Sequence, residues 1–386
     1  MALNRNAYDV AVIGAGVFGA WTAHHLRQAG QRVALLDAWG PAHARASSGG
    51  ESRIIRMGYG ADEIYTRSAM RSLTLWQAFF DKTGQRLFHR TGVLWTASAG
   101  DPYTEATRRT LARCGVAFEN LAPPELAQRY PQMEFAPGAW GIFERESGAL
   151  MARQAVQAVV EDAIRAGVDF EAASVAAPAG QGMVASLETS AGTVRAGAFV
   201  FACGAWLPRL LPDLLANRIT PSRQEAFFFG APPGDRRFAP PAMPVWVDFS
   251  DPRGPYGFPD LENRGVKIAL DRHGTPIDPG IVDRIPSAEG LAAARDFLGQ
   301  RLPALRHAPL MEARVCQYGN TSNGDFLIDR HPDFRNVWLV GGGSGHGFKH
   351  GPALGEYVTG QIVQTSPAEP RFSLATKMET QIRTVF

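Results

Sequence analysis

Three glycines near the start of the chain have the spacing of a phosphate-binding turn. Gly14, Gly16 and Gly19 follow an apolar run at residues 10–13 and lead into a stretch with helical spacing at residues 20–28. In such a strand–turn–helix unit the first glycine permits the tight turn, the second lets the backbone approach a pyrophosphate, and the third lets helix and strand pack closely. The helix dipole then faces the phosphates. The pattern predicts a bound adenine dinucleotide, although a βαβ unit without a nucleotide gives the same local signals.

An acidic residue follows the glycines at the distance expected for ribose binding. Asp37 ends a second apolar run, residues 32–36. Its carboxylate can accept hydrogen bonds from a ribose diol and would repel a 2′-phosphate. FAD or NAD therefore fits better than NADP, and this motif alone does not choose between them.

The composition limits the class of protein and of partner. The chain has 386 residues, 45% hydrophobic and 20% charged, with a net charge of +2, which indicates a soluble globular protein of about two domains. The charge gives no basis for nucleic-acid binding, and we expect no membrane span, no signal peptide and small-molecule partners. The cysteines Cys114, Cys203 and Cys316 lie far apart, which predicts neither a disulfide framework nor a metal site and indicates a cytoplasmic protein.

The elements expected to position these residues are of two kinds, helix-rich segments and strand-rich segments with many prolines. Helical spacing recurs at residues 65–80, 104–114 and 153–166, and two paired strands are predicted at residues 192–195 and 198–202. Short apolar runs with many prolines follow, at residues 226–229, 245–249, 256–258 and 266–270. An apolar strand at 337–340, a glycine-rich turn at 341–347 and a helix from Pro352 end the pattern. The first and last segments are therefore expected to build the nucleotide domain around a strand-rich substrate domain.

Six blocks in order along the chain resemble a known family. They are the glycine fingerprint with Ser52-Arg53-Ile54-Ile55-Arg56, Thr91-Gly92-Val93-Leu94, Cys203-Gly204-Ala205-Trp206, Tyr256-Gly257-Phe258-Pro259, Arg314-Val315-Cys316-Gln317-Tyr318 with Phe326 to Pro332, and Gly343 to Lys349. Together they resemble the monomeric sarcosine oxidase and N-methyltryptophan oxidase family, FAD-dependent amine oxidoreductases of the D-amino acid oxidase superfamily. The likeness spans nearly the whole chain.

The resemblance implies an α/β fold with a Rossmann-type FAD-binding domain, built from N- and C-terminal segments, and an α+β substrate domain. The FAD-binding domain is expected at residues 1–90, 145–217 and 318–386, and the substrate domain at 91–144 and 218–317. The implied reaction oxidises an N-substituted or cyclic amino acid to an imine, which hydrolyses to an aldehyde or keto product and an amine. Molecular oxygen takes the electrons as hydrogen peroxide, and a monomer is expected.

The resemblance also implies how FAD is held. In the family a cysteine two residues before a tyrosine forms a thioether with the flavin ring, which here is Cys316; without the resemblance, such a cysteine would be read as a small buried hydrophobe. The turn at residues 343–347 offers backbone N–H groups to the flavin's N1–C2=O edge, although a simple tight turn has the same glycines. The implied cofactor-binding residues are Gly14, Gly16, Val17, Phe18, Gly19, Asp37, Ser52, Arg53, Gly204, Cys316, Gly343, Gly345, His346, Gly347 and Lys349.

Further matches imply substrate and oxygen contacts. Arg56 and Lys349 match positions that bind the substrate carboxylate, which suits a guanidinium fork and an ammonium point charge. Lys267 matches a lysine near flavin N5 that promotes oxygen reduction. The remaining implied catalytic residues, which match positions at the flavin or the substrate cavity, are Arg53, Tyr256 and Tyr318. The ordinary alternatives are solvated cations and half-buried core tyrosines.

One position departs from the family. Sarcosine oxidases carry an active-site histidine shortly after the lysine, where this chain has Asp271, followed by Arg272 and His273. An aspartate cannot act as a neutral imidazole, and beside a cavity it attracts a cation. Asp271 is therefore predicted to disfavour sarcosine and to favour a substrate with an extra amine or a bulkier secondary or cyclic amino acid. A structural ion pair of Asp271 with Arg272 or Lys267 is the alternative.

Three other functions stay open at this stage. An FAD-dependent dehydrogenase would pass electrons to a quinone or a protein, although Lys267 suits oxygen. A flavoprotein that binds a ligand without turnover is suggested by Asp271 alone. An NAD-dependent dehydrogenase shares the glycine fingerprint but not the later blocks.

Overall fold

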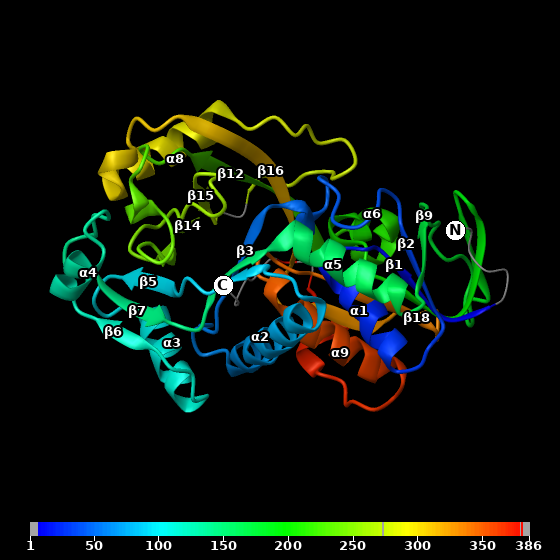
Figure 1. The fold of residues 1–386 in the computed structure, drawn as a ribbon. Coiled ribbons are helices and arrows are strands. Elements are labelled where there is room, and N and C mark those ends of the chain that lie inside the picture. The colour runs from blue at the N-terminus through cyan, green and yellow to red at the C-terminus, as the bar shows by residue number, and fades with distance from the viewer. Residues whose placement is uncertain (1–6, 272–273, 379, 381–386) are drawn as a thin grey trace.

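The structure is a computed structural model, and it describes residues 7–271, 274–378 and 380. Two large sheets lie at opposite ends of the molecule, and helices pack between and around them (Figure 1). Among the described residues, no helix is both long enough and apolar enough to cross a membrane.

The nucleotide sheet has the strand order β17-β18-β11-β1-β2-β9, with β10 paired on β11. The strands β18, β11, β1, β2 and β9 run parallel, whereas β10 and β17 are antiparallel to their neighbours. Their bounds are β1 Tyr8–Ile13, β2 Val33–Asp37, β9 Asp169–Ala172, β10 Ser186–Thr189, β11 Gly192–Phe201, β17 Leu327–Arg330 and β18 Val337–Gly341. Strands from the beginning, middle and end of the chain thus share one sheet, as expected for a Rossmann-type domain.

The second sheet, at the other end of the molecule, has the order β16-β12-β15-β14-β13-β5-β7-β6. It is antiparallel except where β13 pairs with β5. Its bounds are β5 Val93–Ala97, β6 Glu119–Leu121, β7 Trp140–Glu144, β12 Ile219–Phe229, β13 Val245–Asp248, β14 Pro255–Phe258, β15 Val266–Leu270 and β16 Leu310–Thr321. β16 runs through residue 317, where the predicted domain boundary falls, so one continuous strand joins the two units.

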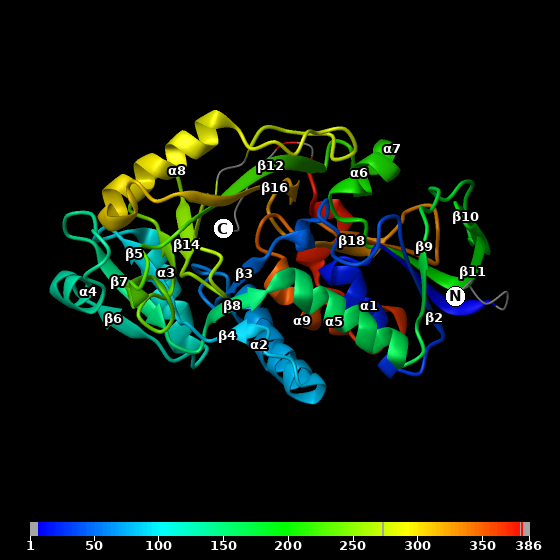
Figure 2. The same cartoon turned by 45° about the horizontal axis from the view of Figure 1, so that its top comes forward.

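A small third sheet lies between the large ones (Figure 2). It contains β3 Ser52–Ile55, β4 Phe88–His89 and β8 Gly148–Met151, in the order β3-β8-β4. The helices are α1 Val17–Gln28, α2 Glu63–Thr83, α3 Pro102–Arg113, α4 Pro123–Arg129, α5 Ala152–Arg165, α6 Leu207–Leu210, α7 Pro212–Leu215, α8 Ala288–Arg301 and α9 Gly351–Ile362.

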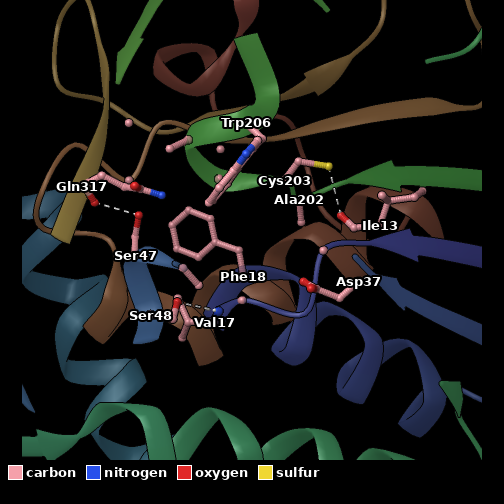
Figure 3. Close-up of a pocket in the computed structure, with 18 of the residues that line it drawn as sticks. Ile13, Val17, Phe18, Asp37, Ser47, Ser48, Ala202, Cys203, Trp206 and Gln317 are labelled. Atoms are coloured by element: carbon pink, nitrogen blue, oxygen red, sulfur yellow. Dashed lines mark hydrogen bonds between the residues drawn. The ribbon is translucent and has the colours of Figure 1, made fainter. Parts of the chain in front are cut away.

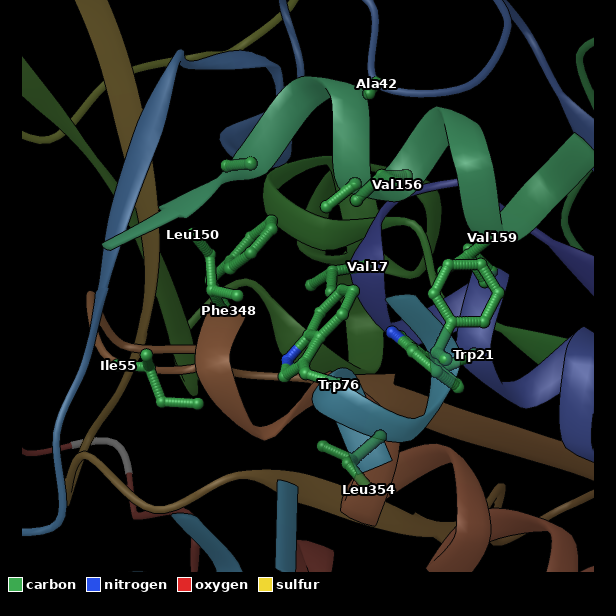
Figure 4. Packing of buried hydrophobic residues seen from close by; sticks show 14 of the residues in the cluster. Val17, Trp21, Ala42, Ile55, Trp76, Leu150, Val156, Val159, Phe348 and Leu354 are labelled. Carbon is green, nitrogen blue, oxygen red and sulfur yellow. The ribbon is translucent and has the colours of Figure 1, made fainter. Parts of the chain in front are cut away.

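The two faces of the nucleotide sheet are buried against different partners. Because successive strand residues point to opposite faces, Val10 and Val12 join a core with α1, α2, α5 and α9, whereas Ala11 and Ile13 join a second core with β10, α6 and α7. Within the first core, Trp21 and Trp76 meet edge to face with ring centroids 5.0 Å apart (Figure 4). The second sheet packs its own core under α8, where Phe297 stacks on Trp246.

One local prediction is wrong. Residues 192–195 and 198–202 are not two paired strands but the single strand β11, and its hairpin partner is β10. The apolar side chains of β11 alternate faces without a break through Ala196 and Gly197, so nothing interrupts the extended backbone. The turn lies earlier, at Gly192, whose φ of +118° permits the reversal.

Candidate functional site

The glycine turn connects β1 to α1 and is shaped by close backbone contacts. Gly14 has φ +104°, and a Cβ there would lie 2.4 Å from the carbonyl oxygen of Ala202, after β11. A Cβ on Gly19 would lie 1.8 Å from the oxygen of Gly14. Gly16 differs, because the nearest atom to its missing Cβ is Ser48 Oγ at 3.5 Å. Gly14 and Gly19 therefore serve packing, and Gly16 leaves open space.

The N-terminus of α1 faces that space with little negative charge of its own. Gly16 is the N-cap and makes no side-chain cap, and the first turn holds no acidic residue. The N–H of Val17 donates to Ser48 Oγ at 3.0 Å (Figure 3). A helix start of this kind binds anions such as a pyrophosphate through its remaining N–H groups and its dipole.

Asp37 lies beside the glycine turn at the end of β2. Its Oδ2 accepts from the N–H of Ala15 at 2.8 Å, and its Oδ1 accepts from the N–H groups of Trp39 and Gly40 at 2.9 and 3.0 Å. These bonds fix the carboxylate at the rim of the cavity described next. Oδ2, which accepts a single bond, keeps a lone pair that a ribose hydroxyl can use.

A cavity of about 380 Å³ opens at the carboxyl ends of β1, β2, β11 and β18. The ring of Phe18 points into it from α1, and Trp206 points toward Phe18 from the other side (Figure 3). The predicted site residues that line it are Gly14, Gly16, Val17, Phe18, Asp37, Arg53, Gly204, Tyr318, Gly343, Gly345 and Gly347. This edge of a parallel sheet is where dinucleotides bind in doubly wound folds.

Five of the predicted cofactor-binding residues do not line this cavity, and neither do the predicted catalytic and substrate residues Arg56, Tyr256, Lys267 and Asp271. Gly19 packs against Gly14, and the four others, Ser52, Cys316, His346 and Lys349, are each next to a lining residue in the chain. The cavity also has walls that the sequence reasoning missed, namely Trp39, His43, Ser47, Ser48, Trp206, Gln317 and Phe348. Ser47 and Ser48 begin the small polar run Ser47-Ser48-Gly49-Gly50 after β2, a signal of a backbone-lined loop that was available in the sequence.

The far end of the cavity is formed by the glycine turn after β18. Gly345 has φ +82°, and a Cβ there would lie 2.7 Å from the ring of Tyr318, so the turn and that ring touch. The N–H of Gly347 donates to the carbonyl of Gly343 at 2.8 Å. The turn continues through one 3-10 turn at residues Phe348–His350 into α9, with Pro352 in its first turn.

Arg53 and Cys316 meet beside this wall. Nη2 of Arg53 lies 3.3 Å from Sγ of Cys316 and donates to the carbonyl of Ser47 at 2.6 Å. The Ser47 hydroxyl in turn donates to the carbonyl of Gln317 at 2.8 Å. Cys114, Cys203 and Cys316 are all free, and burial raises the pKa of Cys203 to about 12. Cys316 is therefore the thiol with a cation in contact.

Lys267 is buried on β15 behind the same wall. Its ammonium donates to the carbonyl of Ser52 at 3.0 Å and lies 4.4 Å from the ring centroid of Phe258. Burial, and next the charge of Arg53, hold the pKa of Lys267 well below its ordinary value. The lysine therefore pairs with Ser52 and not with Asp271.

Tyr256, Tyr318 and Asp271 share one electrostatic environment. The two tyrosine hydroxyls are hydrogen-bonded to each other, and burial followed by the charge of Asp271 raises the pKa of Tyr256 to about 12 and that of Tyr318 well above its ordinary value. Asp271 itself is exposed. Its predicted neighbours Arg272 and His273 lie outside the described residues.

Arg56 and Lys349 form a second cationic group. The guanidinium of Arg56 lies over the rings of Tyr59 and Trp95, 4.5 and 4.6 Å from their centroids. Lys349 donates to Tyr59 Oη at 2.8 Å, and burial followed by the charge of Arg56 holds its pKa well below its ordinary value. Two buried cations this close favour an anionic ligand between them.

A buried carboxylate holds the backbone around Arg56 in place. Glu144, 1% exposed at the end of β7, accepts from the N–H groups of Met57 and Gly58 at 2.7 and 3.0 Å and from the indole N–H of Trp95 at 2.7 Å. Sequence reasoning missed Glu144, because a single glutamate at a strand end gives no signal until the fold brings its partners to it.

The comparisons with known proteins agree with this geometry. Residues 9–361 match the family described as FAD dependent oxidoreductase. The chain belongs to this family. It is 31% identical over 371 residues to the monomeric sarcosine oxidase of Streptomyces avermitilis, covering 94% of this chain and 95% of that one. It is 30% identical to the N-methyl-L-tryptophan oxidase of Yersinia pestis, covering 95% and 99%. Its fold is similar to that of L-proline dehydrogenase from P. horikoshii, with a TM-score of 0.83, 20% identity and coverage of 96% and 97%.

The predicted family, fold class and FAD dependence are thus confirmed, and the NAD-dependent alternative is excluded. As a member of the FAD-dependent oxidoreductase family, this chain has residues that fit the cofactor: the open space at Gly16, the uncapped N-terminus of α1, the fixed carboxylate of Asp37 and the turn at Gly345 all border one cavity.

Proposed function

We propose that this FAD-dependent oxidoreductase is an oxidase of secondary or cyclic amino acids, which converts the amine to an imine while molecular oxygen is reduced to hydrogen peroxide. The observation that supports it best is the buried pair of cations, Arg56 and Lys349, beside the wall of the FAD cavity. The relatives named as sarcosine oxidase and N-methyl-L-tryptophan oxidase also support a substrate with a secondary amine.

The cations bind and orient the substrate in this proposal. The carboxylate of the amino acid pairs with Arg56 and Lys349, which fixes the amine and its carbon at a set distance from the carboxylate. The rings of Tyr59 and Trp95 hold the guanidinium in one orientation, and Glu144 holds the loop beneath it. Tyr256 and Tyr318 keep their protons at neutral pH because their pKa values are raised, so they remain hydrogen-bond donors to the amine side.

FAD supplies a two-electron acceptor when bound. The groups proposed to hold it are the α1 N-terminus and Asp37 at the dinucleotide end, and Cys316, Arg53 and the turn at residues 343–347 at the flavin end. Attachment through a thioether of Cys316 is part of the proposal. The position of the Cys316 thiol, 3.3 Å from the Arg53 guanidinium that lines the FAD cavity, supports it.

Lys267 is proposed to promote oxygen reduction. Its ammonium is the buried cation on the substrate sheet next to Arg53, and a cation there stabilises the negative charge that oxygen gains with its first electron. A buried cation at this position favours oxygen over a quinone or a protein as the electron acceptor. We further propose a monomeric, cytoplasmic enzyme.

Asp271 directs the choice among amines in this proposal. Its carboxylate influences Tyr256, Tyr318 and Lys349, so it faces the substrate side from an exposed position. A negative charge there attracts a substrate with a second, positively charged amine. Sarcosine has a single amine and gains no such interaction.

Anaerobic mixing of the holoenzyme with a panel of N-methyl, cyclic and diamino acids tests the proposal. Bleaching of the flavin absorbance by at least one of these classes, with one hydrogen peroxide released per amine consumed in air, is the expected result. A flavin that no amine bleaches would identify a ligand-binding flavoprotein, and bleaching without peroxide would identify a dehydrogenase with another acceptor.

A further inference from the structure

A chain of hydrogen bonds leads from Lys349 away from the substrate side. Nζ of Lys349 donates to the hydroxyl of Tyr59 at 2.8 Å, and the same hydroxyl lies 2.7 Å from Nε2 of His350. On the opposite side of the imidazole, Nδ1 of His350 lies 2.9 Å from Oγ of Ser68 on α2. Each of these four polar groups is thus within hydrogen-bond distance of the next.

The first three members of this chain are buried, and the last is only half-buried. Lys349 is 4% exposed, Tyr59 2% and His350 0%, whereas Ser68 on α2 is half-buried. The indole N–H of Trp76 donates to the backbone carbonyl of Lys349 at 3.1 Å, and the stacked rings of Trp76 and Phe348 fill the space beside it (Figure 4). Apolar rings therefore pack beside the polar chain at Lys349.

Each middle member can pass a proton on. A tyrosine hydroxyl donates and accepts at one oxygen, and an imidazole takes a proton at one nitrogen while it releases another from the second. His346 forms a side branch: its Nδ1 lies 3.3 Å from the Tyr59 hydroxyl, and its Nε2 donates to the carbonyl of Gly324 at 3.0 Å. Because a backbone carbonyl has no proton to release, the continuous route passes through His350.

The charges around this chain of hydrogen bonds indicate why Lys349 would exchange a proton when a ligand binds. Arg56 lowers the pKa of Lys349, in addition to the larger effect of burial, whereas Asp271 and Glu144 raise it. Burial and then the charges of Lys349, His346 and Arg56 hold the pKa of His350 well below its ordinary value, so its resting form is the neutral imidazole. A bound carboxylate favours the charged form of Lys349, so any proton that Lys349 gains on binding has to come from solvent or from the substrate amine.

We propose that Tyr59, His350 and Ser68 form a proton relay that exchanges protons between Lys349 and solvent when an anionic ligand binds. The inference rests on the proposed function, in which Lys349 binds the substrate carboxylate. For uptake, water protonates Ser68 Oγ as the Ser68 hydroxyl proton moves to His350 Nδ1, the Nε2 proton moves to the Tyr59 oxygen, and the Tyr59 hydroxyl proton moves to Lys349 Nζ. One proton enters, Lys349 gains one charge, and no electrons are transferred.

The test uses the holoenzyme and (methylthio)acetate, a carboxylate that has no amine proton. Stopped-flow mixing in weak buffer follows the flavin absorbance for binding and a soluble pH indicator for proton uptake. In the wild type we expect both signals to rise at the same rate. In His350→Gln, whose amide keeps a hydrogen-bonding group but does not pass protons, we expect uptake to lag behind binding by roughly tenfold or more.

A second variant removes the hydroxyl of Ser68, the last group of the relay, which is less buried than His350. Ser68→Val should delay uptake in the same direction, whereas Thr74→Val, which also removes a hydroxyl from α2 and leaves the route intact, should behave as the wild type. Uptake that keeps pace with binding in both His350→Gln and Ser68→Val would overturn the relay, as would binding to the wild type without any proton uptake. A wild type that gives no binding signal would instead refute the proposed role of Lys349, and the relay with it.

Discussion

The thiol of Cys316 lies 3.3 Å from a guanidinium nitrogen of Arg53, although 263 positions separate the two residues in the chain. Cys316 is on β16 of the substrate sheet, Arg53 is on β3 of the small central sheet, and the bond between Ser47 and Gln317 ties the same two segments together. The contact therefore places a cysteine beside Arg53, a cation that lines the cavity.

Replacement of Cys316 by serine should release the flavin from the polypeptide without removing its binding site. Acid precipitation of the wild type should leave the yellow colour in the pellet, and the same treatment of Cys316→Ser should leave it in the supernatant. Cys203→Ser is the matched control, because the Cys203 thiol lines the cavity and its pKa is raised to about 12 by burial. Free FAD from the wild type would contradict the covalent link.

Gly14 and Gly16 should respond differently to alanine. Gly14→Ala forces a Cβ at φ +104° to within 2.4 Å of the Ala202 oxygen, so we expect a loss of about 3 kcal/mol in the free energy of unfolding. Gly16 has φ −73° and ψ −177°, which any residue adopts, so Gly16→Ala should leave the stability of the apoprotein within about 1 kcal/mol. Its Cβ fills the pyrophosphate space and should weaken FAD binding roughly tenfold. Urea denaturation and flavin titration of the apoproteins measure the two effects, and equal behaviour of both variants would refute the assignment.

Lys267→Met should slow the reaction with oxygen far more than the reaction with the amine. Loss of one preorganised cation beside the developing negative charge is expected to lower the oxygen rate constant by about 10²–10³. Methionine fills the same volume, and it removes an amine whose pKa burial already lowers, so the fold should persist. Stopped-flow reoxidation of the reduced enzyme, beside anaerobic reduction of the oxidised enzyme, separates the two half-reactions. Equal effects on both would contradict the role.

Carboxylate binding should weaken as the pH rises, through Lys349. Its pKa in the folded protein lies well below its ordinary value, so between that pKa and about 10.4 the free site holds a neutral amine that binding must protonate. The dissociation constant of (methylthio)acetate should then increase by up to about tenfold per pH unit in this window. Flavin-absorbance titrations across pH measure it, and Lys349→Met should flatten the slope. In the same pH range Lys349 is protonated in the unfolded chain and not in the folded chain. The contribution of Lys349 to the free energy of unfolding therefore rises with pH in this range.

Asp271→Asn should change selectivity more than rate. For amino acids with a second cationic group we expect kcat/KM to fall about two- to fivefold, the small value typical of an exposed charge pair. For monoamines of the same length kcat/KM should be unchanged or should rise. Paired measurements on each substrate and its uncharged isostere isolate the charge effect, and equal losses for both would assign Asp271 a structural role.

The local elements follow from the sequence alone. The glycine fingerprint, the apolar strands at β1, β2 and β18, and the spacing of α2 and α5 are set by steric and hydrophobic patterns within a few residues, and order-preserving motifs are enough to indicate the family and FAD. Where the prediction was wrong, at β11, the pattern of one long alternating strand was divided at Ala196 and Gly197. Local patterns do not specify which strands pair.

Contacts between distant segments depend on the tertiary structure. Glu144 reaches Trp95 and the loop at Met57, and His350 connects Tyr59 to Ser68, only because three sheets bring separate segments together. None of these residues has a local signature, since a buried polar side chain is defined by the partners that satisfy it. The sequence by itself therefore determined the cofactor and the class of chemistry, whereas the tertiary structure decided the electrostatic setting of each lysine and the route that connects Lys349 to the surface.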